Sequence, residues 1–270
     1  MSKPQSAVVC CDLDGVIWRG DDAIPGSADA VAQLRRDGLR VGFLSNNSSL
    51  PVAQVVAKLA RCGVPADPGE VLTSALAAAD LLVCDLAPGT AVLTCAGPGV
   101  TEALEAVGLR PVDAPPAAAV VVGFHRDFDF DELDRASQAV RGGARFVATN
   151  LDATYPIPGG LLPGAGSIVA AIATAAGATP EVAGKPSRPM AELVKKRLGT
   201  RGVVVGDRPP TDGAMADVLG WPFALVLSGV TGRVAPPGGE RVPDPPPPFV
   251  GDNLASIAPS LARVLQADHS

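Results

Sequence analysis

The sequence has few aromatic residues, no excess of positive charge and no long uninterrupted apolar run. Phe, Trp and Tyr make up 4% of the 270 residues, and Lys plus Arg number 22 against 28 Asp plus Glu, a net charge of −6. The chain therefore lacks the positive field that holds nucleic acids or anionic membranes. No stretch reaches the roughly 18 apolar residues of a membrane span, and the first residues lack the apolar run of a signal peptide. We expect a small-molecule substrate, no nucleic-acid or membrane partner, and a cytoplasmic location.

Cysteine and histidine are also sparse and show no recognisable spacing. The five cysteines are an odd number, Cys10 and Cys11 are adjacent, and no C-x-x-C pair occurs. This pattern predicts small buried thiols in a reducing compartment and suggests neither a disulfide framework nor a zinc site. His125 and His269 are the two histidines, so a mechanism through phosphohistidine has little support.

Apolar residues are plentiful, at 47% of the chain, and their arrangement predicts an α/β fold. Short Val-rich runs without in/out alternation alternate with Ala- and Leu-rich segments at helical spacing. Such strands are buried on both faces, which is typical of a parallel sheet covered by helices on both sides. We predict a Rossmann-like, doubly wound sheet. The expected strands are 7–11, 40–44, 202–207 and 223–229, and the expected helices are 28–38, 51–63, 188–198, 212–220 and 252–266.

The middle of the chain has an α/β rhythm of its own. The expected strands there are 90–97, 117–124 and 144–150, and the expected helices are 75–86, 101–108, 130–143 and 167–177. Because the first pattern resumes afterwards, we interpret 78–178 as an α/β domain inserted into a core made of 1–77 and 179–270. Two consecutive domains are the alternative. The proline-rich run 243–249 is expected to be an extended connector.

Carboxylates follow two of the predicted strands. Asp12 and Asp14 come at the end of the first strand, and because residues i and i+2 of an extended segment point to the same side, both should project from the sheet together. Asp207 and Asp212 follow the strand at 202–207 in the same way. Open α/β sheets place their active sites at this edge. Carboxylates so close repel unless a metal neutralises them or one is protonated, although Asp can also simply cap a turn.

Two further segments supply groups that bind anions. The strand at 40–44 ends in five consecutive polar residues, Ser45-Asn46-Asn47-Ser48-Ser49, whose hydroxyl and N–H groups could cradle an anion. Lys185 lies between Gly184 and Pro186, and a lysine in a loop fixed by such neighbours supplies a localised positive charge. Taken alone, an ordinary surface lysine is the alternative.

Taken in order, the motifs D-L-D-G-V, S-N-N, G-K-P and G-D-R-x-x-T-D resemble those of the haloacid dehalogenase superfamily of phosphohydrolases. The S-N-N form and the long gap before Lys185 resemble the branch that includes NagD, phosphoglycolate phosphatase, 4-nitrophenylphosphatase and glycerol-3-phosphate phosphatase. Members of that branch carry an α/β cap after the second motif, and they often dimerise through it. The resemblance spans essentially the whole chain.

This resemblance implies a role for each matching residue. Asp12 is expected to be the nucleophile and Asp14 the general acid and base. Mg²⁺ is expected to bind Asp12, the backbone carbonyl of Asp14 and Asp207, and Asp212 to orient that site. The groups expected to hold the phosphoryl oxygens are those of Ser45, Asn46, Asn47 and Lys185.

The cap is expected to select the substrate. The resemblance places Tyr155, the one tyrosine of the chain, at the position from which a cap residue reaches the leaving group; packing at the seam of the two domains is the alternative. Where relatives tend to carry an Asp, this chain has Gly123-Phe124-His125-Arg126, so its specificity could differ.

The leading functional hypothesis is a Mg²⁺-dependent phosphomonoester hydrolase for a small metabolite, with glycerol 3-phosphate or 2-phosphoglycolate favoured. A phosphotransferase or mutase would use the same aspartyl-phosphate and pass it to another hydroxyl. A binding protein that has kept the fold without activity is the third reading.

Overall fold

The structure is a computed structural model, and it describes residues 7–157, 160–232 and 240–267. It divides into two compact units. Unit 1 comprises Met1–Ser45, Val55–Leu72 and Ala191–Ser270, and unit 2 comprises Asn46–Gln54 and Thr73–Met190. His269 lies outside the described residues.

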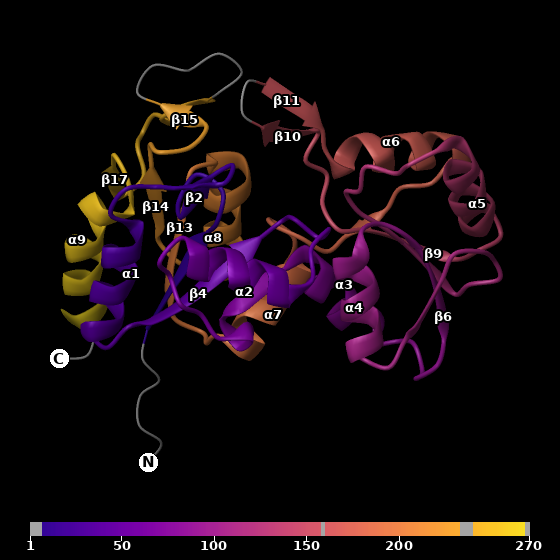
Figure 1. Ribbon diagram of the computed structural model, residues 1–270, viewed down its shortest axis with the longest axis horizontal. Coiled ribbons are helices and arrows are strands. Elements are labelled where there is room, and N and C mark those ends of the chain that lie inside the picture. The colour runs from indigo at the N-terminus through magenta and orange to yellow at the C-terminus, as the bar shows by residue number, and fades with distance from the viewer. Residues whose placement is uncertain (1–6, 158–159, 233–239, 268–270) are drawn as a thin grey trace. The chain divides into compact units, whose positions relative to one another are not determined.

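Unit 1 is built on a six-stranded sheet in the order β17-β14-β13-β1-β4-β5 (Figure 1). Its strands are β1 (Val8–Asp12), β4 (Arg40–Ser45), β5 (Val71–Thr73), β13 (Gly202–Gly206), β14 (Phe223–Val226) and β17 (Phe249–Gly251). The pairs β1–β4, β1–β13, β13–β14 and β14–β17 are all parallel. The predicted α/β class with a doubly wound sheet is confirmed.

The strand order creates a switch point beside β1. From β1 the chain adds β4 and β5 on one side, and after unit 2 it adds β13, β14 and β17 on the other. In open α/β sheets, the crevice at such a reversal is where ligands bind. Val8, Val9, Cys10 and Cys11 are all 0% exposed, which explains why β1 is apolar on both faces.

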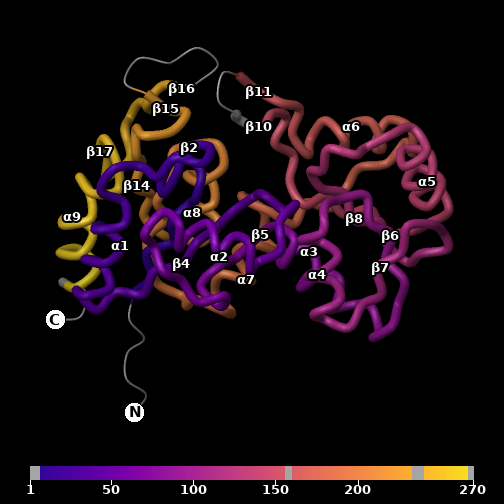
Figure 2. Tube along the Cα trace, viewed as in Figure 1, coloured from indigo at the N-terminus to yellow at the C-terminus, as the bar shows by residue number. Residues whose placement is uncertain are grey.

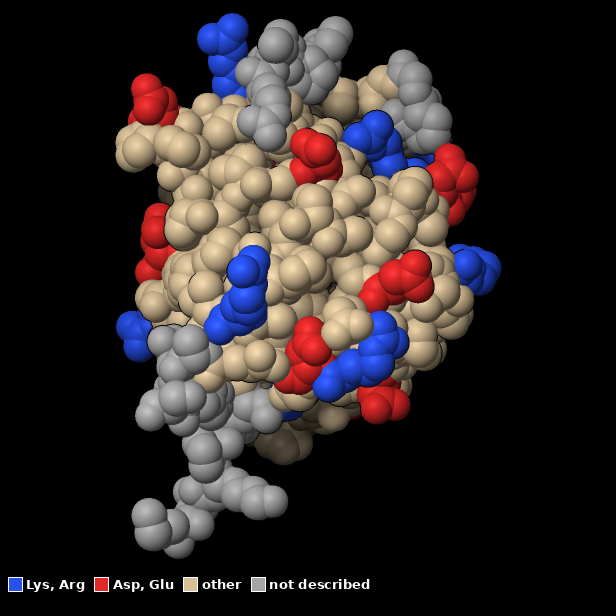
Figure 3. Space-filling view, turned by 90° about the vertical axis from the view of Figure 1, so that its left-hand side faces the viewer, with Lys and Arg blue, Asp and Glu red and all other residues tan. Residues whose placement is uncertain are grey.

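Helices of unit 1 cover its sheet. They are α1 (Ser27–Arg36), α2 (Val52–Arg61), α7 (Arg188–Arg197), α8 (Ala214–Leu219) and α9 (Leu254–Ala267). The first residues of α2 and α7 group with unit 2. α1 and α9 pack against each other, and α9 also contacts β13 and β17. Positively and negatively charged side chains are interspersed over the face that carries α1 and α9, some of them next to one another (Figure 3).

Two local departures from regular structure flank the sheet. A short hairpin of β2 (Trp18–Arg19) and β3 (Asp22–Ala23) follows β1, and a π-helical turn, Pro209–Gly213, stands where the sequence predicted the start of a regular helix. The carbonyl of Arg208 accepts the N–H groups of Thr211, Asp212 and Gly213, at 3.1, 2.7 and 3.4 Å, and the bond from Gly213 spans the five residues of a π turn. Such widened turns are frequent at functional sites.

Unit 2 has a five-stranded parallel sheet in the order β12-β9-β8-β6-β7 (Figure 2). Its strands are β6 (Ala91–Cys95), β7 (Arg110–Val112), β8 (Ala119–Val122), β9 (Arg145–Ala148) and β12 (Glu181–Val182). Its helices are α3 (Ser74–Leu82), α4 (Pro98–Ala106), α5 (Phe130–Arg141) and α6 (Ala165–Ala176), and a hairpin joins β10 (Thr154–Ile157) to β11 (Gly160–Pro163).

The core of unit 2 follows from the register of its strands. Leu93 lies opposite Val120, and Val120 lies opposite Phe146, so these side chains share one face of the sheet. They pack with Ile168 and Ile172 of α6 in one buried cluster. α5 and α6 pack together, as do α3 and α4.

The bounds of the units differ from the expected division at residues 78 and 178. Residues 46–54, 73–77 and 179–190 group with unit 2. The reason is local: the Ser74 hydroxyl donates to the carbonyl of Asn46 at 2.7 Å, and the Asn46 side chain bonds the backbone of Lys185.

Among the described residues, no helix is long and apolar enough to cross a membrane.

Candidate functional site

The loop after β1 holds Asp14 in a defined orientation. The chain turns tightly here: the N–H groups of Ile17 and Trp18 donate to the carbonyl of Leu13, at 2.9 and 3.2 Å. Gly15 has φ +82°, a conformation that other residues rarely adopt. The turn returns the indole of Trp18 to Asp14, and its Nε1 donates to Asp14 Oδ1 at 3.0 Å.

Three carboxylates meet beside the switch point of the sheet. Asp12 ends β1, Asp207 follows β13, and Asp212 lies in the π-helical turn. Oxygen atoms of the three all lie within 4.8 Å of one another. Asp207 is 3% exposed and Asp212 is 0% exposed, so their charges are shielded little by water. The structure thus brings together three of the four carboxylates that the sequence singled out.

Glycines pack directly against Asp207. A Cβ atom at Gly15 would lie 2.4 Å from Asp207 Oδ2, and one at Gly229 would lie 1.8 Å from the same atom. The N–H of Val230 donates to this oxygen at 2.7 Å. Only residues without a side chain fit on this side of Asp207, and the carboxylate is held in one place.

Asp212 is fixed from within its own turn. The N–H of Arg208 donates to Asp212 Oδ2 at 3.1 Å, and a Cβ atom at Gly206 would lie 2.2 Å from that oxygen. Burial raises the pKa of nearby Glu240, the charge of Asp212 raises it further, and Arg208 lowers it.

The donor set fits a hard divalent cation. Three close carboxylates, two of them buried, need a compensating positive charge. Oxygen ligands are those that Mg²⁺ prefers, with one or two carboxylates and the substrate phosphate completing its coordination. Among the described residues, this is one of two clusters whose ligand atoms are close enough for a metal ion; the other, in unit 2, contains a thiol.

The polar residues at the end of β4 and after it belong to two different units. Ser45 is 4% exposed at the end of β4, in unit 1. Asn46, in unit 2, uses its side chain on the Lys185 loop: Oδ1 accepts from the N–H of Lys185 at 2.8 Å, and Nδ2 donates to the Lys185 carbonyl at 3.1 Å. Nδ2 also donates to Asp152 at 3.1 Å. The Asn46 amide thus holds Lys185, which is 4% exposed.

Neighbouring residues complete this arrangement in unit 2. Asn150 Nδ2 donates to the carbonyl of Asn46 at 2.7 Å. The Asn47 side chain closes its own turn, because Oδ1 accepts from the N–H and the hydroxyl of Ser49, at 2.9 and 2.6 Å. The oxygen of Asn47 and the amide of Asn46 are therefore engaged within unit 2.

Tyr155 lies in the hairpin of unit 2. Its ring stacks on Phe124, with centroids 5.3 Å apart and planes inclined by 19°. Phe124 belongs to the Gly123–Arg126 segment that the sequence singled out as unusual. The two cap features noted separately in the sequence are therefore neighbours in the structure.

Sequence reasoning missed several residues around the site. Trp18 gave no signal beyond lying four residues after Asp14, and the roles of Asn150 and Asp152 beside Asn46 gave none. Gly229 follows a predicted strand, but nothing in the sequence shows that it packs on Asp207. These roles depend on contacts between segments far apart in the chain.

Comparison with known proteins yields consistent similarities. Residues 9–110 match the family model described as haloacid dehalogenase-like hydrolase, and residues 182–257 match one described as HAD-hydrolase-like. A D-glycerol 3-phosphate phosphatase from Mycobacterium tuberculosis is 39% identical over 251 residues, which are 91% of this chain and 69% of that protein. A glycerol-3-phosphate phosphatase from Gallus gallus is 33% identical over 282 residues, covering 93% of this chain and 90% of that protein.

A solved structure shows the same fold. The crystal structure of glycerol phosphate phosphatase from Mycobacterium tuberculosis in complex with magnesium superposes with a TM-score of 0.83 and 36% identity. The match covers 96% of this chain and 77% of that one.

Proposed function

Because this chain belongs to the haloacid dehalogenase-like hydrolases, we propose that it is a Mg²⁺-dependent phosphatase that hydrolyses small phosphomonoesters through an aspartyl-phosphate at Asp12. The observation that carries the proposal is the cluster of Asp12, Asp207 and Asp212 at the switch point of the sheet. Glycines and backbone N–H groups hold two of these carboxylates in place.

The reaction has two steps. A carboxylate oxygen of Asp12 attacks phosphorus, the bond from phosphorus to the ester oxygen breaks, and Asp14 gives its proton to the departing alcohol. Asp14 then takes a proton from water as the water attacks phosphorus, which releases phosphate and restores Asp12. The Trp18 indole holds Asp14 for both proton transfers.

The remaining residues bind the metal ion and the phosphoryl oxygens and neutralise the charge of the phosphoryl group. Asp12, the backbone carbonyl of Asp14 and Asp207 would hold Mg²⁺, and Asp212 would orient the arrangement. The ion supplies charge stabilisation for the phosphoryl oxygens. Ser45 and backbone N–H groups after β4 bind those oxygens, and Lys185 supplies a positive charge to the phosphoryl group. The contacts of Asn46 favour a role in holding Lys185 over a side-chain contact to phosphate.

Glycerol 3-phosphate is the first candidate substrate, since the relatives compared above are named for it. 2-Phosphoglycolate is the next. Tyr155, supported by Phe124, is proposed to contact the organic part of the substrate. We place the reaction in the cytoplasm, where such metabolites are made and consumed.

The test is release of inorganic phosphate from a panel of small phosphomonoesters, with Mg²⁺ or with excess EDTA. Asp12→Asn should reduce turnover at least a thousandfold, as loss of a nucleophile does. Asp113→Asn makes the same chemical change at an exposed position and should leave turnover unchanged.

Each outcome is decisive for one part of the proposal. Release that survives EDTA would overturn the metal requirement, and release by Asp12→Asn would remove Asp12 from the nucleophilic role. Phosphate found on added glycerol instead of in solution would identify a phosphotransferase.

A further inference from the structure

A cysteine, a histidine and a glutamate meet in unit 2, among residues that the proposed reaction does not use. Cys95 is the last residue of β6, His125 follows β8, and Glu132 lies in the first turn of α5. Their sulfur, nitrogen and oxygen atoms lie within 4.8 Å of one another. Because β6 and β8 are neighbouring parallel strands, the cluster lies at the carboxyl edge of the second sheet.

The hydrogen bonds of His125 orient its Nε2 atom toward Glu132. Nδ1 lies 3.2 Å from the carbonyl oxygen of Gly123, which can only accept, so Nδ1 carries a proton when this bond forms. Nε2 lies 2.7 Å from Glu132 Oε2, and the two groups form an ion pair when the ring is protonated. In the neutral ring with a proton on Nδ1, the lone pair of Nε2 is the one that a metal ion beside Glu132 would bind.

Side-chain contacts around the cluster match those of metal sites. A histidine that binds a metal through one ring nitrogen usually donates the other N–H to a carbonyl or carboxylate, as His125 does to Gly123. The ring of Phe128 packs edge-on against His125, with centroids 6.0 Å apart and planes at 86°. The imidazole is therefore held in one orientation.

Burial distinguishes a ligand role from a nucleophilic one. Cys95 is 0% exposed, so its sulfur cannot attack a substrate from solution. The side chains of His125 and Glu132 are 11% and 17% exposed, so a metal ion can reach them from the solvent. Sulfur, imidazole and carboxylate together suit Zn²⁺ and do not suit Mg²⁺.

We propose that Cys95, His125 and Glu132 bind a Zn²⁺ ion, with water as the fourth ligand. Tetrahedral ligation with Zn–N and Zn–O bonds of about 2.1 Å separates the two atoms by about 3.4 Å. A small rotation of the Glu132 side chain provides this spacing. The ion joins β6, the segment after β8 and α5, and so stabilises unit 2.

The test uses Co²⁺ in place of Zn²⁺, added to the full-length protein in excess Mg²⁺, which occupies sites with oxygen ligands alone. The wild type should show thiolate-to-cobalt charge-transfer absorption in the near ultraviolet and intense tetrahedral d–d bands, both saturating at one equivalent. Added Zn²⁺ should abolish them. Cys84→Ser removes an exposed thiol of the same unit and should leave the spectrum unchanged.

Cys95→Ser should lose the charge-transfer band, and His125→Gln should lose the tetrahedral bands while circular dichroism stays as in the wild type. Zn²⁺ at a hundredfold excess over its Kd should raise the unfolding midpoint of the wild type and of Cys84→Ser by about 5 °C or more. The proposal is overturned if the wild type lacks the charge-transfer band, or if the band persists in Cys95→Ser.

Discussion

Asp14 is held in part by a neighbouring side chain, that of Trp18. The Trp18 indole donates to Asp14 Oδ1, and Lys58 Nζ lies 4.5 Å from the centre of the same indole, which holds the ring from the other side. The Lys58 ammonium also donates to the carbonyl of Gly20 at 2.7 Å. The proposed general acid is thus positioned by a chain of contacts that begins at α2.

Replacing Trp18 by Phe should therefore slow esters whose leaving groups need a proton. The ring and its contact with Lys58 remain, while the hydrogen bond to Asp14 is lost. We expect kcat for glycerol 3-phosphate to fall about tenfold, and kcat for 4-nitrophenyl phosphate, whose leaving group needs no acid, to change little.

Trp221→Phe is the matched control for this variant. Trp221 is the other tryptophan of the chain, and its Nε1 donates to the carbonyl of Thr200 at 3.1 Å. This change should leave the ratio of the two kcat values as it is in the wild type. Equal slowing of both esters by Trp18→Phe would contradict a role for Trp18 in positioning the acid.

Gly15 provides a second test at the level of single residues. Gly15→Ala places a Cβ atom against Asp207 and should raise the Mg²⁺ concentration for half-maximal activity about tenfold or more. Gly38 has a similar φ of +80° but has no heavy atom within 4 Å of the position of a Cβ. Gly38→Ala therefore carries the same backbone strain of about 1–2 kcal/mol and should leave the Mg²⁺ titration unchanged.

The residues of the site were only partly predictable from the sequence. The positions of Asp12 and Asp207 at strand ends follow from the apolar runs before them, because the end of a buried strand is visible in the pattern. The role of Asn46 is not visible, because its amide bonds a loop 139 residues further along the chain. A contact of that kind depends on tertiary packing that no local pattern encodes.

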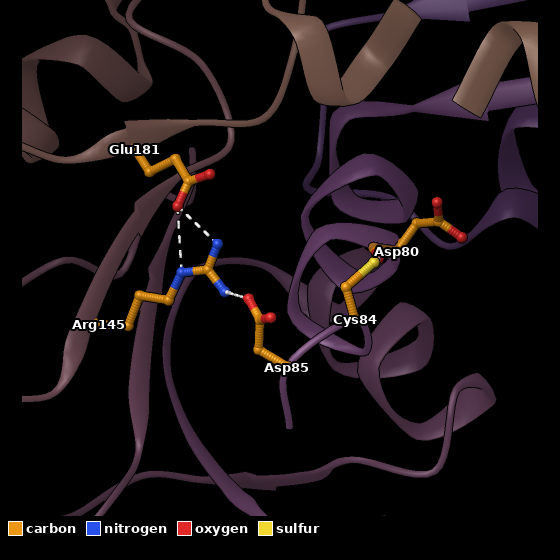
Figure 4. A network of polar contacts seen from close by, with 5 residues as sticks. All are labelled: Asp80, Cys84, Asp85, Arg145 and Glu181. Carbon is orange, nitrogen blue, oxygen red and sulfur yellow. Dashed lines mark hydrogen bonds and ion pairs between the residues drawn. The ribbon is translucent and has the colours of Figure 1, made fainter. Parts of the chain in front are cut away.

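Among the elements, β9 is tied to its neighbours by Arg145. The guanidinium donates to Glu181 of β12 through Nε and Nη2, at 3.1 and 2.6 Å, and to Asp85 through Nη1 at 2.9 Å (Figure 4). Asp85 follows α3, so one side chain links two strands and the end of a helix. The Asp85 and Glu181 side chains are 68% and 44% exposed, and water therefore weakens both ion pairs.

Arg145→Gln should consequently lower the free energy of unfolding by only about 0.5–1 kcal/mol. The loss should shrink in 1 M NaCl, where the Debye length is about 3 Å. Arg110→Gln, at an exposed position of β7, should have no salt-dependent effect. Thermal unfolding at low and high salt measures the difference, and a loss that does not depend on salt would contradict an electrostatic contribution.

Long elements were predictable and short ones were not. The helix expected at 130–143 is α5, and the strand expected at 40–44 is β4, because amphipathic spacing and continuous apolar runs mark both. The hairpin of β2 and β3 and the strand β12 each contribute only two residues per strand, too few for a period to emerge.

For the molecule as a whole, the rhythm of strands and helices, which pauses and then resumes, predicts one α/β domain inserted into another. The limits of the units were less visible. Residues 46–54 follow β4 in sequence but group with unit 2, since Ser48 bonds Thr149 and the N–H of Gly99 donates to the carbonyl of Ser49. Such tertiary contacts determine which unit a segment belongs to. They cannot be predicted from the order of strands and helices along the chain.

The partly buried carboxylate of Glu240 should make the stability of the protein depend on pH. Burial raises the pKa of Glu240, so its contribution to stability is present below its unfolded pKa and is lost as pH rises through the folded value. At neutral pH the ionised group destabilises a chain that already carries a net charge of −6. Glu240→Gln should raise the free energy of unfolding by up to about 0.5 kcal/mol at pH 7.5 and leave it unchanged at pH 4.

The control for this prediction is Asp217→Asn, which removes one exposed negative charge from the same unit. This variant measures how the loss of one negative charge alone changes the free energy of unfolding. A gain for Glu240→Gln that is equal at the two pH values, or equal to that of Asp217→Asn, would contradict the role of burial.

The most direct measurement is chemical identification of the phosphorylated residue. The Asp14→Asn variant, which lacks the proposed base for hydrolysis, is mixed with 4-nitrophenyl phosphate and Mg²⁺, quenched and reduced with borohydride. We predict a burst of one nitrophenol per protein chain and conversion of residue 12 to homoserine, seen by peptide mass spectrometry. No burst, or a reduced residue at any other position, would contradict the assignment of Asp12 as the nucleophile.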